Sequence, residues 1–255
     1  MTYFNNLGQA RLGWRIPSGG GGNSIITNGL ILNLDAGNVS SYPGTGTTWT
    51  DLSPTGNNGT LPSSVAPGPT WSSTNGGIFS FDGVNDYINM GNNTAYNLTN
   101  ISVSVWFKPT TGTPNYSPII SRYSSGINNL QGWVISYVAS TSKFNIGGRE
   151  NASVFLSFSS TNTYSINNWY NVTWTKSAST WSLYVNGTLD RTTTIGNGTT
   201  AYLSNNMQIG ASFEWSPGDK YYGKQDIPAV NIYNRALSQG EVTQNYNAIK
   251  TRFGL

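Results

Sequence analysis

Short runs in which apolar and polar residues alternate recur along most of the chain. In the clearest run, Ile101, Val103 and Val105 lie on one side of a predicted strand, and Ser102 and Ser104 point outward from the other. A period of two is typical of a β-strand with one buried face. The same pattern occurs at Phe79 and Phe81, at Trp133, Ile135 and Tyr137, at Tyr170, Val172 and Trp174, and at Trp181, Leu183 and Val185. Such runs about every 8–14 residues, separated by turn residues, predict a β-sandwich or jelly roll.

The connections between these runs carry turn signals. Asn186 and Gly187 follow one strand and precede another, which predicts a type I′ hairpin because both residues tolerate positive φ. Residues 41–77 are rich in glycine and proline and contain no long alternating run, so we expect loops and short strands there.

The end of the chain changes from a strand period to a helix period. Val230 and Ile232 alternate with Asn231, which predicts a half-buried strand, and Ser238 and Glu241 then have the spacing of a capping box. Apolar residues at helical spacing follow, and Gly254 stands where a helix would stop. The sequence therefore predicts one short C-terminal helix over 239–252.

Residues 1–28 differ from the rest and are predicted to be an extended N-terminal arm, with a single domain over 29–255. The arm has no clear period, and residues 18–24 have the composition of a glycine-rich linker. Its large side chains would serve as attachment anchors, with two arginines facing acidic or carbonyl-rich surface. A disordered leader is the alternative. The expected attachment residues are Tyr3, Phe4, Leu7, Arg11, Leu12, Trp14 and Arg15.

Composition removes several classes of chemistry. Only 9% of the residues are charged, the net charge is +3 and no basic run occurs, which argues against a nucleic-acid partner. Cysteine and histidine are both absent, so a disulfide, a thiol nucleophile and a Ser-His-Asp triad are excluded. The sequence has no apolar stretch long enough to span a membrane and no signal-peptide core. We therefore expect no membrane insertion and synthesis in a cytoplasm without export.

Four segments together resemble laminin-G-like, or concanavalin A-like, jelly-roll domains. They are LNLDAGN at 32–38, FDGVNDY at 81–87, WSLYVNG at 181–187 and IYNRALS at 232–238. The resemblance implies an all-β antiparallel β-sandwich with one short C-terminal helix. The ending QNYNAIKTRFG at 244–254 resembles a subset found in structural proteins of tailed bacteriophages. That subset implies a virion location, several copies per particle, and other virion proteins as partners through the arm.

At the position where family members often bind calcium, this chain departs from the family pattern. Family members often carry an acidic pair near a bound calcium in the penultimate strand, where this chain has Ile227, Pro228, Ala229 and Val230. Asp35, Asp51 and Asn57 are weak alternative Ca²⁺ ligands, because Asx residues in turns usually bond to their own backbone. No cofactor is otherwise expected.

The carboxylates needed for glycoside hydrolysis are missing from the sequence pattern. Glucanases of this fold carry a motif such as E-x-D-x-E, and none of Glu150, Glu214 and Glu241 has an acidic residue two or four positions away. Asp82 and Asp86 are the one close pair, and they flank a turn that favours aspartate structurally. No catalytic residue is predicted.

A loop over 213–222 is the predicted carbohydrate site. Trp215, Tyr221 and Tyr222 would offer apolar platforms beside the polar Asp219. The alternative is that Tyr222 belongs to the core and Trp215 packs on the sheet edge. The sequence thus predicts a non-enzymatic phage capsid or tail component that adheres weakly to host-surface glycans. A free lectin-like module is the second interpretation, and a glycoside hydrolase is a distant third.

Overall fold

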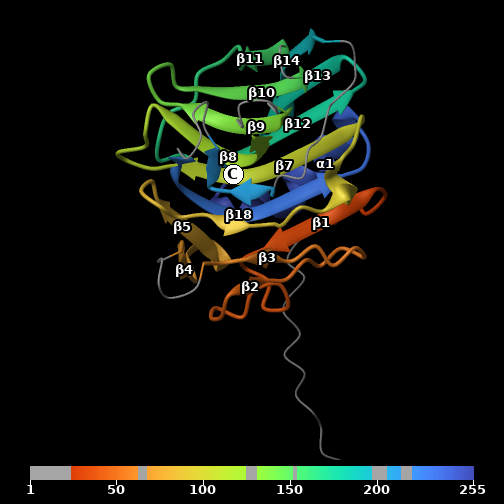
Figure 1. Cartoon of the computed structure of the whole chain (residues 1–255). Helices are drawn as coiled ribbons and strands as arrows, with labels where there is room; N and C mark the ends of the chain where they lie inside the picture. Colours follow the sequence, from red (N-terminus) through yellow and green to blue (C-terminus); the bar gives the residue numbers. More distant parts are fainter. Residues whose placement is uncertain (1–23, 63–67, 125–130, 152–153, 197–205, 214–219) are drawn as a thin grey trace, which may run out of the picture.

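The computed structural model describes residues 24–62, 68–124, 131–151, 154–196, 206–213 and 220–255, and it is built from two antiparallel sheets packed face to face (Figure 1). Sheet A has the order β14 (Thr188–Thr194), β13 (Thr180–Val185), β12 (Tyr170–Ser177), β7 (Ile101–Pro109), β18 (Lys224–Tyr233), β5 (Ile78–Asp82) and β4 (Thr70–Ser72), with β1 (Leu30–Asp35) also paired to β18.

Sheet B forms the opposite layer. Its order is β11 (Val154–Ser159), β10 (Lys143–Asn151), β9 (Gln131–Val138), β8 (Tyr116–Ser124), β15 (Gln208–Ile209), β6 (Ile88–Asn89), β3 (Gly59–Thr60) and β2 (Thr48–Trp49). The strands β16 (Ala211–Phe213) and β17 (Lys220–Tyr222) pair as a separate hairpin. Single 3₁₀ turns occupy Thr74–Gly76 and Thr94–Tyr96. The predicted β-sandwich is confirmed, including the short strands expected over 41–77.

The core between the sheets is built from the inward residues of the alternating runs. Trp174 lies between two other rings, with its centroid 5.5 Å from Trp133 and 5.0 Å from Trp181. Gly148 leaves room for this cluster, because a Cβ there would lie 2.8 Å from the Trp181 ring. Burial of large rings such as these supplies most of the driving force for closing the two sheets.

The strand predicted at Val230 and Ile232 is the second half of the long strand β18. Strand β18 starts at Lys224, and its pairing with β7 shifts register between Asp226 and Ala229. Pro228 lies inside this irregularity, where its missing N–H costs no ladder bond. Its carbonyl accepts a hydrogen bond from the Ala36 N–H at 2.8 Å.

The C-terminal helix α1 (Gln239–Ile249) begins at the predicted capping box. The Ser238 side chain accepts from the Glu241 N–H, and the Glu241 carboxylate accepts from the Ser238 N–H. The predicted helix over 239–252 is α-helical only as far as Ile249 and continues as a 3₁₀ turn over Lys250–Phe253. Gly254 then takes a left-handed conformation with φ of 74° and ends it.

Helix α1 covers the outer face of sheet A. Trp106 points away from the core and stacks on Phe253 at 4.5 Å and on Tyr246 at 5.7 Å. The predicted hairpin turn docks here as well, with φ of 51° at Asn186 and 75° at Gly187. Gly187 also lies close to Tyr246, since a Cβ there would be 3.0 Å from its ring. The turn therefore needs glycine for both its conformation and its contact with α1.

The start of the described chain is fixed to the same helix. The Ser24 carbonyl accepts from Gln244 Nε2 at 2.8 Å, the Ile26 N–H donates to Asn245 Oδ1 at 2.8 Å, and Ile25 packs nearby. The anchors predicted between Tyr3 and Arg15 lie outside the described residues. Within the described part of the chain, no helix is long and apolar enough to cross a membrane.

Candidate functional site

The outer face of sheet B carries the candidate site. Alternation in β9 sends Trp133 and Ile135 into the core and Val134 to the opposite, outer side. The β16–β17 hairpin lies over β8 on this side, where the Ser121 hydroxyl donates to the Ala211 carbonyl at 2.8 Å. The hairpin and the sheet together form a hollow that strands alone would not make.

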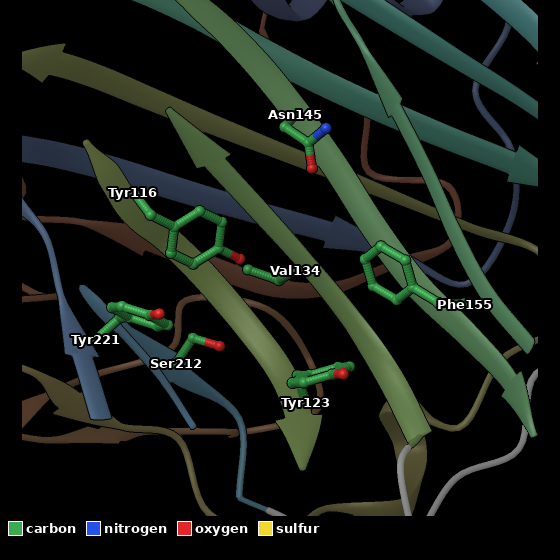
Figure 2. Close-up of a pocket in the computed structure, with 7 residues that line it drawn as sticks. All are labelled: Tyr116, Tyr123, Val134, Asn145, Phe155, Ser212 and Tyr221. Carbon is green, nitrogen blue, oxygen red and sulfur yellow. The ribbon is translucent and has the colours of Figure 1, made fainter. Parts of the chain in front are cut away.

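This hollow, which we call the tyrosine cavity, has a volume of about 220 Å³. Strands β8 to β11 supply its base, and the hairpin closes one side (Figure 2). Aromatic and small polar side chains line it, and among the described residues around it none carries a carboxylate or an ammonium group. The lining residues are Tyr116, Tyr123, Val134, Asn145, Phe155, Ser212 and Tyr221.

The cavity combines a buried floor with exposed rims. Val134 and Ser212 are buried, whereas Phe155 on β11 and Tyr221 on β17 keep 43% and 37% of their surface exposed. Tyr221 packs edge-on against Tyr116, with ring centroids 5.0 Å apart and an interplanar angle of 65°. Figure 2 shows this ring pair at one end of the cavity and Tyr123 with Phe155 at the other. Exposed rings held by neighbouring rings are preformed surfaces for an apolar ligand face.

Polar contacts fix the base of the cavity. Asn145 Nδ2 donates to the Ser157 hydroxyl at 3.0 Å, to the Ser159 hydroxyl at 3.1 Å and to the Phe158 carbonyl at 3.3 Å. Its amide therefore has one orientation. Next to it Gly147 leaves room for the Val134 and Phe155 side chains, because a Cβ there would lie 3.2 Å from Val134 Cγ1 and 3.3 Å from Phe155 Cζ.

The loop predicted to bind sugar falls partly on this cavity. Tyr221 lines it, and Trp215 and Asp219 lie outside the described residues. Tyr222 is half-buried in the hairpin rather than in the core, and burial, followed by the nearby Tyr87 hydroxyl, raises its pKa. Sequence analysis missed Tyr116, Tyr123 and Phe155. Their positions in the alternating strand pattern could have identified them, because large rings stand there at outward positions, which are ordinarily polar.

The close acidic pair forms a turn. Asp86 Oδ2 accepts from the Asp82 N–H at 2.9 Å, and Asp82 Oδ1 accepts from the Val84 N–H at 2.8 Å. Burial raises the pKa of Asp86 to about 6, and the neighbouring Asp82 charge adds to the effect. These bonds are the turn chemistry expected from the sequence. Neither carboxylate lines the tyrosine cavity.

The three weak calcium candidates do not form one site, because Asp51 and Asn57 lie together and Asp35 has a different partner. Asp51 is buried and its carboxylate accepts from the backbone N–H groups of Asn33, Ser53 and Asn57, each at 2.8 Å. Asn57 is thus brought to Asp51 as a donor, and its own amide oxygen accepts from Asn93 Nδ2.

Asp35 instead forms an ion pair with Arg252 at 2.6 Å. Among the described residues, no three Asp, Glu, His or Cys side chains gather at a site that could hold a metal ion. The contacts of Asp35, Asp51 and Asn57 are those of loop-organising residues.

Comparisons with solved structures identify the same architecture in binding domains. The chain matches a solved structure of botulinum neurotoxin type C, a toxin whose cell entry is dependent upon interaction with two ganglioside molecules. The TM-score is 0.63, with 20% identity over 87% of this chain and 51% of that one. The binding domain of botulinum neurotoxin DC in complex with SialylT matches with a TM-score of 0.63 and 18% identity over 88% and 52%. The chain therefore spans about half the length of these toxin chains.

A third structure matches along its full length. It is domain 4 of AbnA, an extracellular arabinanase of Geobacillus stearothermophilus, in complex with arabinotriose, with a TM-score of 0.64 and 15% identity over 87% of this chain and 100% of that one. No curated protein matches the sequence. The family model described as concanavalin A-like lectin/glucanases superfamily covers residues 82–243, more than half of the chain. The protein therefore belongs to the concanavalin A-like lectin/glucanase superfamily and has its lectin-like jelly-roll fold.

Proposed function

We propose that this protein is a non-catalytic glycan-binding module and that the tyrosine cavity holds the sugar. The observation that carries the proposal is the set of partly exposed rings, Tyr116, Tyr221 and Phe155, around a buried floor. One face of a pyranose is apolar and its rim is polar, so it suits a cavity of rings and small polar groups.

Preorganisation favours binding at this place. The edge-on contact with Tyr116 and the fixed amide of Asn145 mean that little side-chain freedom is lost when a ligand binds. The described lining offers no carboxylate pair for hydrolysis, which supports binding without cleavage. The ganglioside-dependent toxin and the arabinotriose complex support a carbohydrate as the ligand class.

The test is a glycan array probed with the wild-type protein and with Tyr221→Ala. We expect wild-type binding and a loss of about 1.5–3 kcal/mol in the variant, the size of one large buried side chain. Leu189→Ala is the matched control, since Leu189 is 46% exposed on β14 in the other sheet. If Tyr221→Ala binds the same glycans as strongly as the wild type, the binding site lies outside the tyrosine cavity.

We infer further that the arm attaches the module to a bacteriophage particle in several copies. The first described residues, Ser24 and Ile25, are fixed to α1 on the side of sheet A, and the tyrosine cavity lies on the outer face of sheet B. Attachment through residues 1–23 would leave the cavity facing outward. Many weak sites on one particle then bind a cell surface with high avidity.

Deletion of residues 1–23 tests the attachment. We expect the remaining domain to fold and to retain its glycan binding, but to be lost from purified particles. Normal incorporation without the arm would place the docking surface on the jelly roll. Absence of the full-length chain from particles would favour the free lectin-like module.

A further inference from the structure

A second hollow lies on the same outer face of sheet B, across the β16–β17 hairpin from the tyrosine cavity. It has a volume of about 280 Å³ and is formed over β3 and β6. We call it the Tyr87 hollow. Its lining residues are Thr47, Thr60, Leu61, Pro62, Tyr87 and Asn89.

The hairpin supplies side chains toward both hollows. In β17 successive side chains point to opposite sides, so Tyr221 meets Tyr116 in the tyrosine cavity while Lys220 points the other way. Lys220 Nζ lies 4.5 Å from the centre of the Tyr87 ring, a cation–π contact that fixes the ring at the edge of the second hollow. The hairpin therefore lines the tyrosine cavity directly and reaches the second hollow only through the contact of Lys220 with Tyr87.

The Tyr87 hollow offers the mixture of groups that a sugar needs. Leu61, Pro62 and Tyr87 give it an apolar side, and the other three residues bring hydroxyl and amide groups. Asn89 Oδ1 accepts from the Gly91 N–H at 3.0 Å, which orients the amide. Within the described residues, Asn89 Nδ2 and the hydroxyls of Thr47 and Thr60 make no hydrogen bond, so they remain available to a ligand.

We propose that the Tyr87 hollow is a second carbohydrate site, which takes a single neutral pyranose unit. Its volume lies just below the roughly 300–1,000 Å³ of pockets for larger ligands, so one sugar ring fits it better than a chain. The ligand class rests on the function proposed above. The location of the second site is independent of that function, because the two hollows share no lining residue.

The experiment uses methyl α-glucopyranoside and methyl β-galactopyranoside as probes, titrated into the full ¹⁵N-labelled chain and followed by NMR. We expect the amide signals of Tyr87 and Asn89 to shift, and to do so equally in Tyr221→Ala. Thr60→Val, which removes one hydroxyl at constant shape, should weaken binding at these signals by about two- to tenfold. Thr194→Val on the exposed edge of sheet A is the matched control and should change nothing.

The pattern of shifts separates the two sites. Shifts at Tyr116 and Phe155 without any at Tyr87 and Asn89 would overturn the second site and leave the proposed function intact. Shifts at Tyr87 and Asn89 alone would support the second site and count against the tyrosine cavity. No shift in either hollow with both probes would overturn both.

Discussion

The strands of both sheets alternate inward and outward residues, but the outer faces of the two sheets are covered to different extents. On sheet A, α1 and the segment leading into it cover the strands, so that Ser102 and Ser104 are 0% and 2% exposed. On sheet B the three-residue strands of the β16–β17 hairpin are the cover that the described residues provide, and Phe155 stays 43% exposed. The covered face buries these two hydroxyls, and the open face keeps an aromatic ring exposed.

A polar side chain that is buried by such cover needs a hydrogen-bond partner within the protein. Ser104 Oγ accepts from Asn171 Nδ2 at 3.0 Å and from the Thr173 hydroxyl at 2.9 Å. The same rule holds on sheet B beneath the hairpin, where the buried Ser121 hydroxyl donates to the Ala211 carbonyl, but beside the hairpin the face also carries large exposed rings, which favour a binding surface. The comparison teaches that cover separates a face held together by packing, on sheet A, from the face of sheet B that carries the proposed ligand site.

The largest expected effect is on the covered face. Trp106→Ala removes a ring that is 2% exposed and stacked between Phe253 and Tyr246, so we expect a loss of about 3–5 kcal/mol in the free energy of unfolding. Phe155→Ala on the open face should cost less than about 1 kcal/mol, as at most surface sites. Urea unfolding of both variants measures the difference, and equal losses would remove the distinction between the faces.

The fold was predictable from the sequence wherever alternation and local caps agree. The runs at Ile101 and Trp133, the Asn186–Gly187 turn and the Ser238 capping box are all observed. The expectation that Ser102 and Ser104 point outward identified their side but not their burial. Cover by α1 is a long-range contact, and no local pattern encodes it.

An intermediate effect is expected at the base of the tyrosine cavity. Gly147→Ala places a methyl group 3.3 Å from Phe155 and so shifts that ring, and we expect glycan binding to weaken by about 1–2 kcal/mol with little change in stability. Isothermal titration with a glycan selected on the array measures it. Gly240→Ala in α1 is the matched control, because nothing lies within 4 Å of its Cβ position. Unchanged affinity in Gly147→Ala would show that the ligand does not use this base.

The site was less predictable than the fold. Tyr221 was found because it stands in an aromatic-rich loop, whereas Tyr116 and Phe155 stand on strands where a ring usually means core. Their placement outward depends on register with β9 and β10 and on the hairpin that packs over β8. Register and packing of distant strands are set by the whole sheet, so the cavity could not be assembled from local sequence.

The smallest expected effect concerns the helix that provides the cover. The Arg235 guanidinium, 2.6 Å from the Glu241 carboxylate, lowers the pKa of Glu241 to about 2 from an ordinary value of 4.5. A lowered pKa means that this charge stabilises the fold above pH 4.5 and that the contribution is lost as pH falls toward 2. Because the pair is partly exposed, we expect only about 1 kcal/mol.

Glu241→Gln isolates that contribution, since glutamine keeps the capping box and removes the charge. Urea unfolding at several pH values should give wild-type and variant stabilities that differ at about pH 6 and converge near pH 2. Asp86, whose raised pKa of about 6 makes the fold less stable as pH rises from 3.8, is present in both proteins and cancels in the difference. A difference that stays constant over this range would mean that the charge of Glu241 does not hold α1 over sheet A, and the cover would then rest on the other contacts of the helix, among them the stacked rings of Trp106, Tyr246 and Phe253.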